Sequence, residues 1–188
     1  MMLMMSHCFT GRAEETSLGF SPKKQFEAVI QTSDIHEMTL VFRKASSHKR
    51  LGSYFLGSYS PYVKLLWSPT ERDVAVQTHC SRHTNELVVF AVTGTSIKQV
   101  NLQDYRQNIF GRLGILHGGR GQVDEPLKWL TNDHLLLQAM GSLPDTEDGF
   151  RTEGGYRYHV ELRITPDYDD FVGWLEKIEK ADENKTNK

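Results

Sequence analysis

The chain has 188 residues, of which 38% are hydrophobic and 24% are charged, and its formal net charge is −2. This length and apolar content favour one folded domain over a disordered chain. The near balance of basic and acidic residues argues against a nucleic acid or an anionic membrane as partner, and no apolar run is long enough to cross a membrane. The two cysteines, Cys8 and Cys80, are too few for a disulfide framework, and the sequence leaves open whether they pair.

Residues 1–19 are expected to precede the folded domain, and two interpretations of them stay open. The apolar run at residues 1–5 is shorter than the core of a signal peptide, but small residues follow it, as they do before a signal-peptidase site. The segment is therefore either a disordered tail or the remnant of a truncated secretory signal, with Cys8 as a candidate lipid-attachment residue. A signal would place the protein in the periplasm or outside the cell, and a plain tail would leave it in the cytoplasm.

Residues 20–165 are predicted to form a β domain, because short apolar stretches follow one another at turn-sized intervals. Apolar and polar residues alternate over residues 37–44, which predicts a strand with one buried face. Residues 87–92 are apolar at every position, which predicts a central strand covered on both faces. The other predicted strands are residues 25–32, 51–56, 63–67, 73–78, 97–102, 135–139 and 156–164.

Two helices are predicted from apolar residues at helical spacing. The first is inserted at residues 102–116 and is expected to end at Gly118-Gly119. The second opens at Pro166, and residues 166–188 are expected to comprise this C-terminal helix and a polar tail. The apolar stripes are Leu102, Tyr105, Ile109, Leu113 and Leu116 in the first helix, and Phe171, Trp174, Leu175 and Ile178 in the second.

An internal repeat is the most informative feature of the sequence. The segments Phe20-Ser21-Pro22 and Trp67-Ser68-Pro69 are 47 residues apart, and a looser copy begins at Trp129. Each copy has an aromatic residue, a polar turn and then an apolar strand. This order is typical of a hairpin whose aromatic residue ends one strand on the buried face.

These motifs resemble the blades of TolB-type and WD-repeat-like β-propellers, whose inner hairpin reads aromatic-Ser-Pro-Asp-Gly before an apolar strand. At the Asp-Gly this chain has Lys23-Lys24 and Thr70-Glu71, without the glycine that favours a tight turn of positive φ. The resemblance covers residues 20–165 and implies antiparallel blade sheets. Because a closed propeller has four or more blades, three signatures predict a mainly β, open stack of propeller-blade-like sheets, or a sandwich-like stack, with a helix over one edge.

Two loops carry residue types that can bind ligands. His79, Cys80 and His83 are candidate metal ligands, although no second pair follows at zinc spacing and a polar hairpin turn accounts for them equally well. Residues 117–122 are glycine-rich and include Arg120, which suits either an anion-binding loop or a helix end. No nucleophile, base or paired-carboxylate motif is present, so we expect no catalytic residue and no cofactor.

We therefore expect a non-catalytic β interaction or scaffold module that binds another protein, since propeller-like folds commonly serve as binding platforms. The stripe of the first helix either packs within its own domain or docks a partner, in which case Tyr105, Ile109 and Arg120 are candidate contacts. Two other interpretations remain open. One is a metal- or ligand-binding enzyme accessory domain that uses the His79/His83 or 117–122 loops, and the other is a fragment of a longer β-propeller.

Overall fold

The computed structural model describes residues 14–57, 62–81, 84–116, 121–143, 155–167 and 170–181. Its elements are β1 (Glu14–Phe20), β2 (Phe26–Thr32), β3 (Met38–Lys44), β4 (Arg50–Gly57), β5 (Val63–Trp67), β6 (Asp73–Ser81), β7 (Thr84–Val92), β8 (Ile97–Gln99), β9 (Asn101–Leu102), α1 (Tyr105–Leu113), β10 (Val123–Trp129), β11 (His134–Ser142), β12 (Gly155–Asp167) and β13 (Asp170–Lys180). No helix in these ranges has the length and apolar character needed to cross a membrane.

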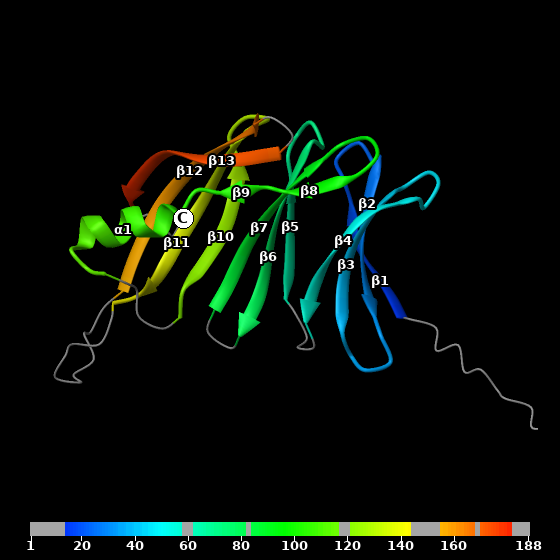
Figure 1. The fold of residues 1–188 in the computed structure, drawn as a ribbon, viewed down its shortest axis with the longest axis horizontal. Coiled ribbons are helices and arrows are strands. Elements are labelled where there is room, and N and C mark those ends of the chain that lie inside the picture. Colours follow the sequence, from blue (N-terminus) through cyan, green and yellow to red (C-terminus); the bar gives the residue numbers. More distant parts are fainter. Residues whose placement is uncertain are drawn as a thin grey trace, which may run out of the picture.

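The strands form three sheets that lie side by side in chain order (Figure 1). The first sheet is the meander β1-β2-β3-β4, and the second is β5-β6-β7-β8. The third is the meander β10-β11-β12-β13, to which β9 adds in parallel beside β13. All other strand pairs are antiparallel. The prediction of a mainly β fold of antiparallel, propeller-blade-like sheets is thus confirmed.

The sequence repeat marks the same place in each sheet. Phe20, Trp67 and Trp129 are the last residues of β1, β5 and β10, which are the first strands of the three sheets. Each is followed by a turn into the second strand. The repeat therefore encodes the opening hairpin of each sheet, as its aromatic-turn-strand order predicted. The expectation that the aromatic residue lies on the buried face is wrong for Phe20, which is 51% exposed because it ends an edge strand.

The turns of the first two copies have the same geometry. The hydroxyls of Ser21 and Ser68 each accept a backbone N–H from the residue five positions later, at 3.0 and 3.1 Å. Lys24 and Glu71 occupy the left-handed region, with φ of 58° and 63°. The chain thus adopts the positive-φ turn at both positions without glycine, which strains the backbone locally.

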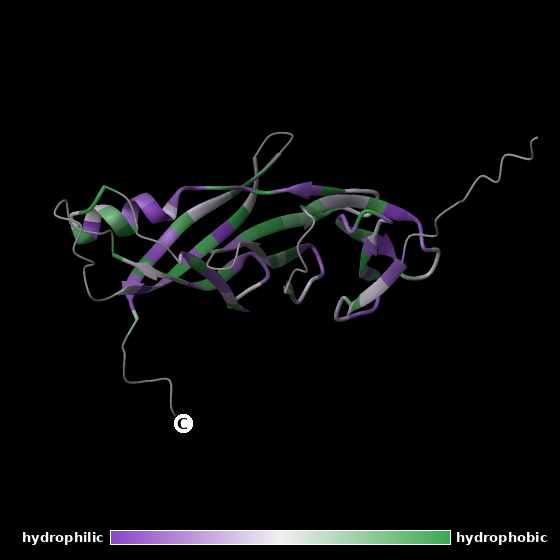
Figure 2. Cartoon of the chain, turned by 90° about the horizontal axis from the view of Figure 1, so that it is seen from below, coloured by the Kyte–Doolittle hydropathy of each residue, from purple (hydrophilic) through white to green (hydrophobic). Residues whose placement is uncertain are grey.

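The second sheet is buried on both faces, as the apolar run in β7 predicted. Val88, Phe90 and Val92 contribute to a core shared with the first sheet. Leu87, Val89 and Ala91 point the other way, into a core shared with the third sheet. Green hydrophobic segments accordingly run through the middle of the molecule in Figure 2. Because alternate side chains of β7 point to opposite faces, this strand packs against both the first and the third sheet.

Helix α1 confirms the helix predicted at residues 102–116 in a shorter form. Asp104 caps its N-terminus, and its side chain accepts the N–H of Gln107 at 3.2 Å. The prediction that Gly118-Gly119 ends the helix is wrong. Gly114 ends the helix instead, in a left-handed conformation with φ of 69°. A glycine adopts that conformation most easily, and Gly114 precedes Gly118-Gly119 in the chain.

The predicted C-terminal helix is wrong, because residues 170–180 form strand β13. A β-bulge in β13 opposite Glu161 and Leu162 adds one residue to the strand. Leu175 and Ile178 consequently face the same core although they are three positions apart, a spacing that resembles one turn of a helix. The bulge, and not a helix, accounts for the periodicity.

The apolar patterns did not reveal β1 and β10, although the repeat implies a strand that ends at Phe20 and another that ends at Trp129. β1 begins at Glu14, so the expected boundary of the tail at residue 19 is also wrong. Both are edge strands with an irregular register, around Leu18 in one and Leu127 in the other. β10 also contains Pro126, which an edge strand tolerates. Polar composition and bulges therefore hid both strands from a pattern search.

Candidate binding cleft between the second and third sheets

A cleft of about 770 Å³ separates the second and third sheets where the repeat turns lie. The second sheet contributes Asp73 at the start of β6 and the Thr93-Gly94 turn after β7. The third sheet contributes Asp133 from its opening turn and Phe171 at the start of β13. Charged, hydroxyl-bearing and apolar side chains thus line one cleft, which is typical of a binding site.

Asp73 is the distinctive group in this cleft. Its side chain is largely buried, with 7% of the residue exposed, and its backbone N–H donates to Ser68. No described residue gives its carboxyl a hydrogen bond. Burial raises the pKa of Asp73 from 3.8 to about 7, with Arg72 opposing the rise and Asp133 adding to it. The cleft therefore holds a carboxyl group whose ionised form lacks a fixed partner.

Asp133, on the opposite wall, is in a different environment. The hydroxyl of Thr131 donates to it at 2.8 Å, which holds the pKa of Asp133 below its ordinary value. Nδ1 of His134 lies 3.3 Å and Nε of Arg163 lies 3.5 Å from its carboxyl oxygens. Arg163 also lies 4.0 Å from Glu176. These groups already satisfy one another, which leaves Asp73 as the group without a described partner.

A second charged cluster lies at the start of β10 and attaches helix α1 to the third sheet. Arg106 contacts both carboxyl oxygens of Asp124, at 2.7 and 3.2 Å, and donates to the hydroxyl of Tyr156 at 2.7 Å. Burial raises the pKa of Asp124, and the guanidinium of Arg106 opposes that rise. Because Arg106 pairs with Asp124 and also bonds Tyr156, the cluster links α1 to two strands of the third sheet, and we interpret it as structural.

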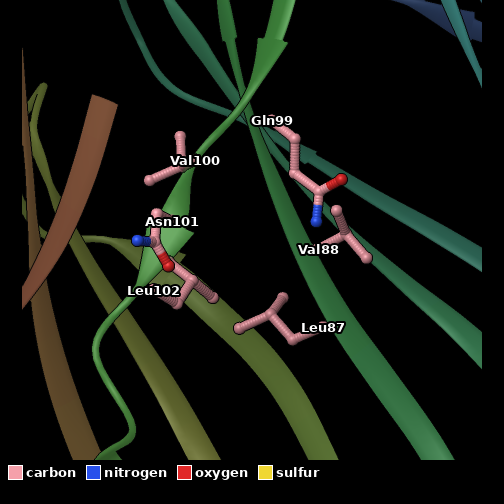
Figure 3. Close-up of a pocket in the computed structure, with 6 residues that line it drawn as sticks. All are labelled: Leu87, Val88, Gln99, Val100, Asn101 and Leu102. Atoms are coloured by element: carbon pink, nitrogen blue, oxygen red, sulfur yellow. The ribbon is translucent and has the colours of Figure 1, made fainter. Parts of the chain in front are cut away.

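A smaller pocket of about 380 Å³ lies where the chain crosses from the second sheet to the third. Figure 3 shows Leu87 and Val88 of β7 opposite the crossing segment that runs from Gln99 to Leu102. Its lining is apolar apart from two amides and includes no charged side chain. This chemistry offers a ligand little to recognise beyond shape, so the pocket is a weaker candidate than the cleft.

The residues singled out from the sequence do not converge on one site. The side chains of His79 and Cys80, and the whole of His83, lie outside the described residues, as does Arg120 with residues 117–120. Across the described ranges no three His, Cys, Asp or Glu side chains are grouped so as to hold a metal ion.

The candidate contacts on the first helix are not exposed. Tyr105 and Ile109 are 6% and 0% exposed within the core shared by the second and third sheets. Tyr105 and Ile109 therefore pack within their own domain, which is the first of the two interpretations given above, and present no surface to a partner, whereas Leu116 at the end of the stripe is exposed.

Sequence reasoning missed the cleft. The available signal was the repeat itself, because Asp73 stands five positions after Ser68, where the first copy has Phe26 after Ser21. A carboxyl where the first copy has a phenylalanine marks a change of role.

Comparison with known proteins gives no family. No family model matches the chain, and no curated protein is significantly similar to it. A solved structure titled "Kluyveromyces lactis Hsv2 complete loop 6CD" is similar at 12% sequence identity with a TM-score of 0.42. The match covers 86% of this chain and 46% of that one, so the chain spans about half the length of that protein.

Proposed function

We propose that this protein is a non-catalytic interaction module, and that the cleft between its second and third sheets binds a segment of a partner protein. The observation that carries the proposal is Asp73, a buried carboxyl that faces the cleft without a hydrogen bond from any described residue. A carboxyl group that lines a cleft and receives no hydrogen bond from a described residue is available to a bound partner.

The lining of the cleft suits a polypeptide. Thr70, Thr93 and Thr165 place hydroxyl groups around it, and Ile164 and Phe171 add apolar surface. Such a mixture can hydrogen-bond a main chain and bury alternate side chains of an extended segment. The volume of about 770 Å³ falls within the usual range of ligand sites and accommodates a few residues.

The TolB-type and WD-repeat-like resemblance of the repeat supports the same proposal by analogy. Blade-like sheets are commonly used as rigid platforms, and their binding sites lie in the loops at one end of the sheets. The repeat turns of this chain line the cleft from both sides, so the same elements that define the fold would present the partner site.

Gly94 offers a clean way to test the site. It lines the cleft, is not in the left-handed region, and a Cβ there would meet no atom within 4 Å. Gly94→Trp should therefore obstruct the cleft without disturbing the fold. Gly111→Trp is the matched control, because Gly111 is an exposed residue of α1 with equally open surroundings.

The measurement is quantitative mass spectrometry of proteins that co-purify with the tagged chain from its native host. We expect at least one protein to be retained by the wild type and by Gly111→Trp but reduced about tenfold or more by Gly94→Trp, the loss expected when roughly 1.4 kcal/mol or more of binding energy is removed. If every co-purifying protein is retained equally by Gly94→Trp, the cleft is not the partner site.

A further inference from the structure

We propose that the cleft recognises a basic side chain, a lysine or an arginine of the partner segment, whose cationic group binds the carboxylate of Asp73. This inference rests on the proposed function and names the anchor of the bound segment. The ligand group is an organic cation, and Asp73 is its counter-ion.

The first copy of the repeat shows how an aromatic residue packs at the position equivalent to Asp73. In the first copy the equivalent residue is Phe26, which faces the second sheet and stacks on Trp67 with ring centroids 6.2 Å apart. Asp73 faces the third sheet in the same way, since its neighbour two positions on, Ala75, belongs to the core shared with that sheet. Asp73 therefore places a carboxyl where the first interface has an aromatic ring. Burying the ionised carboxyl lowers the stability of the fold, and a bound cation would offset that loss.

The pairing of the charged groups, two arginines and two aspartates, points to Asp73 as the group that a ligand can pair with. Arg163 is paired with Asp133 at 3.5 Å and lies 4.0 Å from Glu176, so neighbouring carboxylates offset its attraction for an anion. Arg72 is exposed at the start of the same strand and opposes the raised pKa of Asp73 without a described hydrogen bond to it. Among the described residues, a cation that enters the cleft therefore competes with one exposed arginine for Asp73.

The cleft also suits the long stem of a basic residue. Val92, Ile164 and Phe171 line it together with Asp73. Lysine and arginine bury their methylene groups along apolar surface while the charged group reaches a polar partner. A calcium ion needs six or more oxygen ligands, whereas Asp73 and Asp133 are the only carboxylates among the described residues that line the cleft, so an organic cation fits this part of the lining better than a metal.

Binding should be coupled to the proton on Asp73. The cation binds the ionised carboxyl, and burial holds the pKa of that carboxyl at about 7 in the free protein. Below that pH a proton must leave before the cation binds, so affinity should fall by about tenfold for each pH unit. Arg72, Asp133 and Arg163 are the other charged groups that line the cleft, and burial does not raise the pKa of Asp133 above its ordinary value.

The test uses N-acetyl-lysine N-methylamide as the cationic probe and N-acetyl-norleucine N-methylamide as its uncharged counterpart, followed by NMR on the full chain. The lysine probe should shift the amide signals of Asp73 and Gly94 and lower the pKa of the Asp73 carboxyl by about one unit or more. The norleucine probe should do neither, and Asp73→Asn should abolish the response. Equal responses to both probes, or a response retained in Asp73→Asn, overturn the inference.

The failure of this inference is distinguishable from failure of the proposed function. If a protein lost with Gly94→Trp is retained by a folded Asp73→Asn variant, the cleft binds a partner but not through a cation at Asp73. If the lysine probe binds as expected while no protein depends on the cleft, the cation site stands and the protein-binding proposal falls. The melting temperature of Asp73→Asn verifies that the variant is folded.

Discussion

The two interfaces between neighbouring sheets are built from the same repeat but differ at the end where the repeat turns lie. Between the first and second sheets, Phe26 stacks on Trp67, and Phe42 meets Trp67 edge to face at 5.9 Å. The buried side chain of Glu71 also reaches across and accepts the backbone N–H of Lys23. This interface is closed by aromatic packing and by one bond between equivalent turns.

Between the second and third sheets the corresponding end is open. Trp129 occupies the place of Trp67, but its indole donates to the backbone carbonyl of Leu66 at 2.9 Å. Asp73 stands where the first interface has an aromatic ring, and the cleft lies beside it. The two interfaces therefore differ, at equivalent positions of the repeat, by an aromatic ring in one and a carboxyl beside a cleft in the other.

The open interface is supported elsewhere by α1, which the first interface lacks. Phe110 packs edge to face on Tyr156 at 6.0 Å, and Arg112 donates to the carbonyl of Ile178 at 2.8 Å. Arg106 and Asp124 add their ion pair near the start of β10, whereas the cleft lies beyond its end. The stabilising contacts of α1 and the cleft thus lie at opposite ends of one interface, so the proposed binding site is separated from the groups that hold the sheets together.

The largest effect is expected from Ile109→Asp, which removes the support of the open interface. Ile109 is fully buried in the core shared by the second and third sheets. A carboxylate there should lower the free energy of unfolding by about 4 kcal/mol or more, so the variant should melt much earlier or fail to fold. Thermal unfolding followed by circular dichroism measures this.

Leu116→Asp is the control for that substitution. Leu116 belongs to the same sequence stripe but is 90% exposed, so the same charge should change stability by less than about 0.5 kcal/mol. If Ile109→Asp melts like the wild type but loses a bound partner, the packing role of α1 is wrong.

The next largest effect is expected from Asp73→Phe, which gives the open interface the side chain that the closed interface has at the equivalent position. The substitution removes a buried carboxyl and places an aromatic ring at the position equivalent to Phe26, which stacks on Trp67 in the first interface. We expect the free energy of unfolding to rise by about 2 kcal/mol, as measured by urea unfolding at neutral pH. Asp73→Asn separates the loss of charge from the gain of packing. A less stable Asp73→Phe would show that the two interfaces are not equivalent in shape.

A smaller effect is expected in the pH dependence of stability. The pKa of Asp73 rises from 3.8 to about 7 on folding, so between these values the folded state holds a proton that the unfolded state has lost. The free energy of unfolding should therefore fall as pH rises through this window, by at most about 1.4 kcal/mol per unit, and level off above about pH 7. Urea unfolding of wild type and Asp73→Asn across this range should give curves that diverge. Parallel curves would contradict the raised pKa.

Much of this fold was predictable because its strands alternate regularly. The uniform apolar run from Leu87 to Val92 predicted a strand covered on both faces, and the repeat predicted the opening hairpin of each sheet. Bulges account for the errors. They hid β1 and β10, and in β13 they gave Leu175 and Ile178 a helical spacing.

The cleft was harder to predict, because it depends on the approach of two sheets and not on any local pattern. The Thr93-Gly94 turn and Phe171 have no recognisable motif and meet only in the folded chain. Asp73 can be identified within the repeat from the sequence. The significance of the carboxyl becomes clear only when its position in the structure is compared with that of Phe26, which stacks on Trp67. Repeat copies compared position by position would have identified this one residue, but not the cleft that it lines.

The smallest predicted effect compares the two strained turns. Lys24 is exposed with φ of 58°, so Lys24→Gly should relieve the left-handed strain and raise the free energy of unfolding by up to about 1 kcal/mol. Glu71 has φ of 63° but is buried, and its carboxylate accepts the N–H of Lys23 across the first interface. Glu71→Gly should therefore relieve the same strain yet lose the contact that closes the interface, and lower stability by about 1 kcal/mol or more. Urea unfolding of the two variants side by side measures the difference. If both glycine variants are stabilised equally, the bond from Lys23 contributes nothing, and the first interface is held closed by its aromatic packing alone.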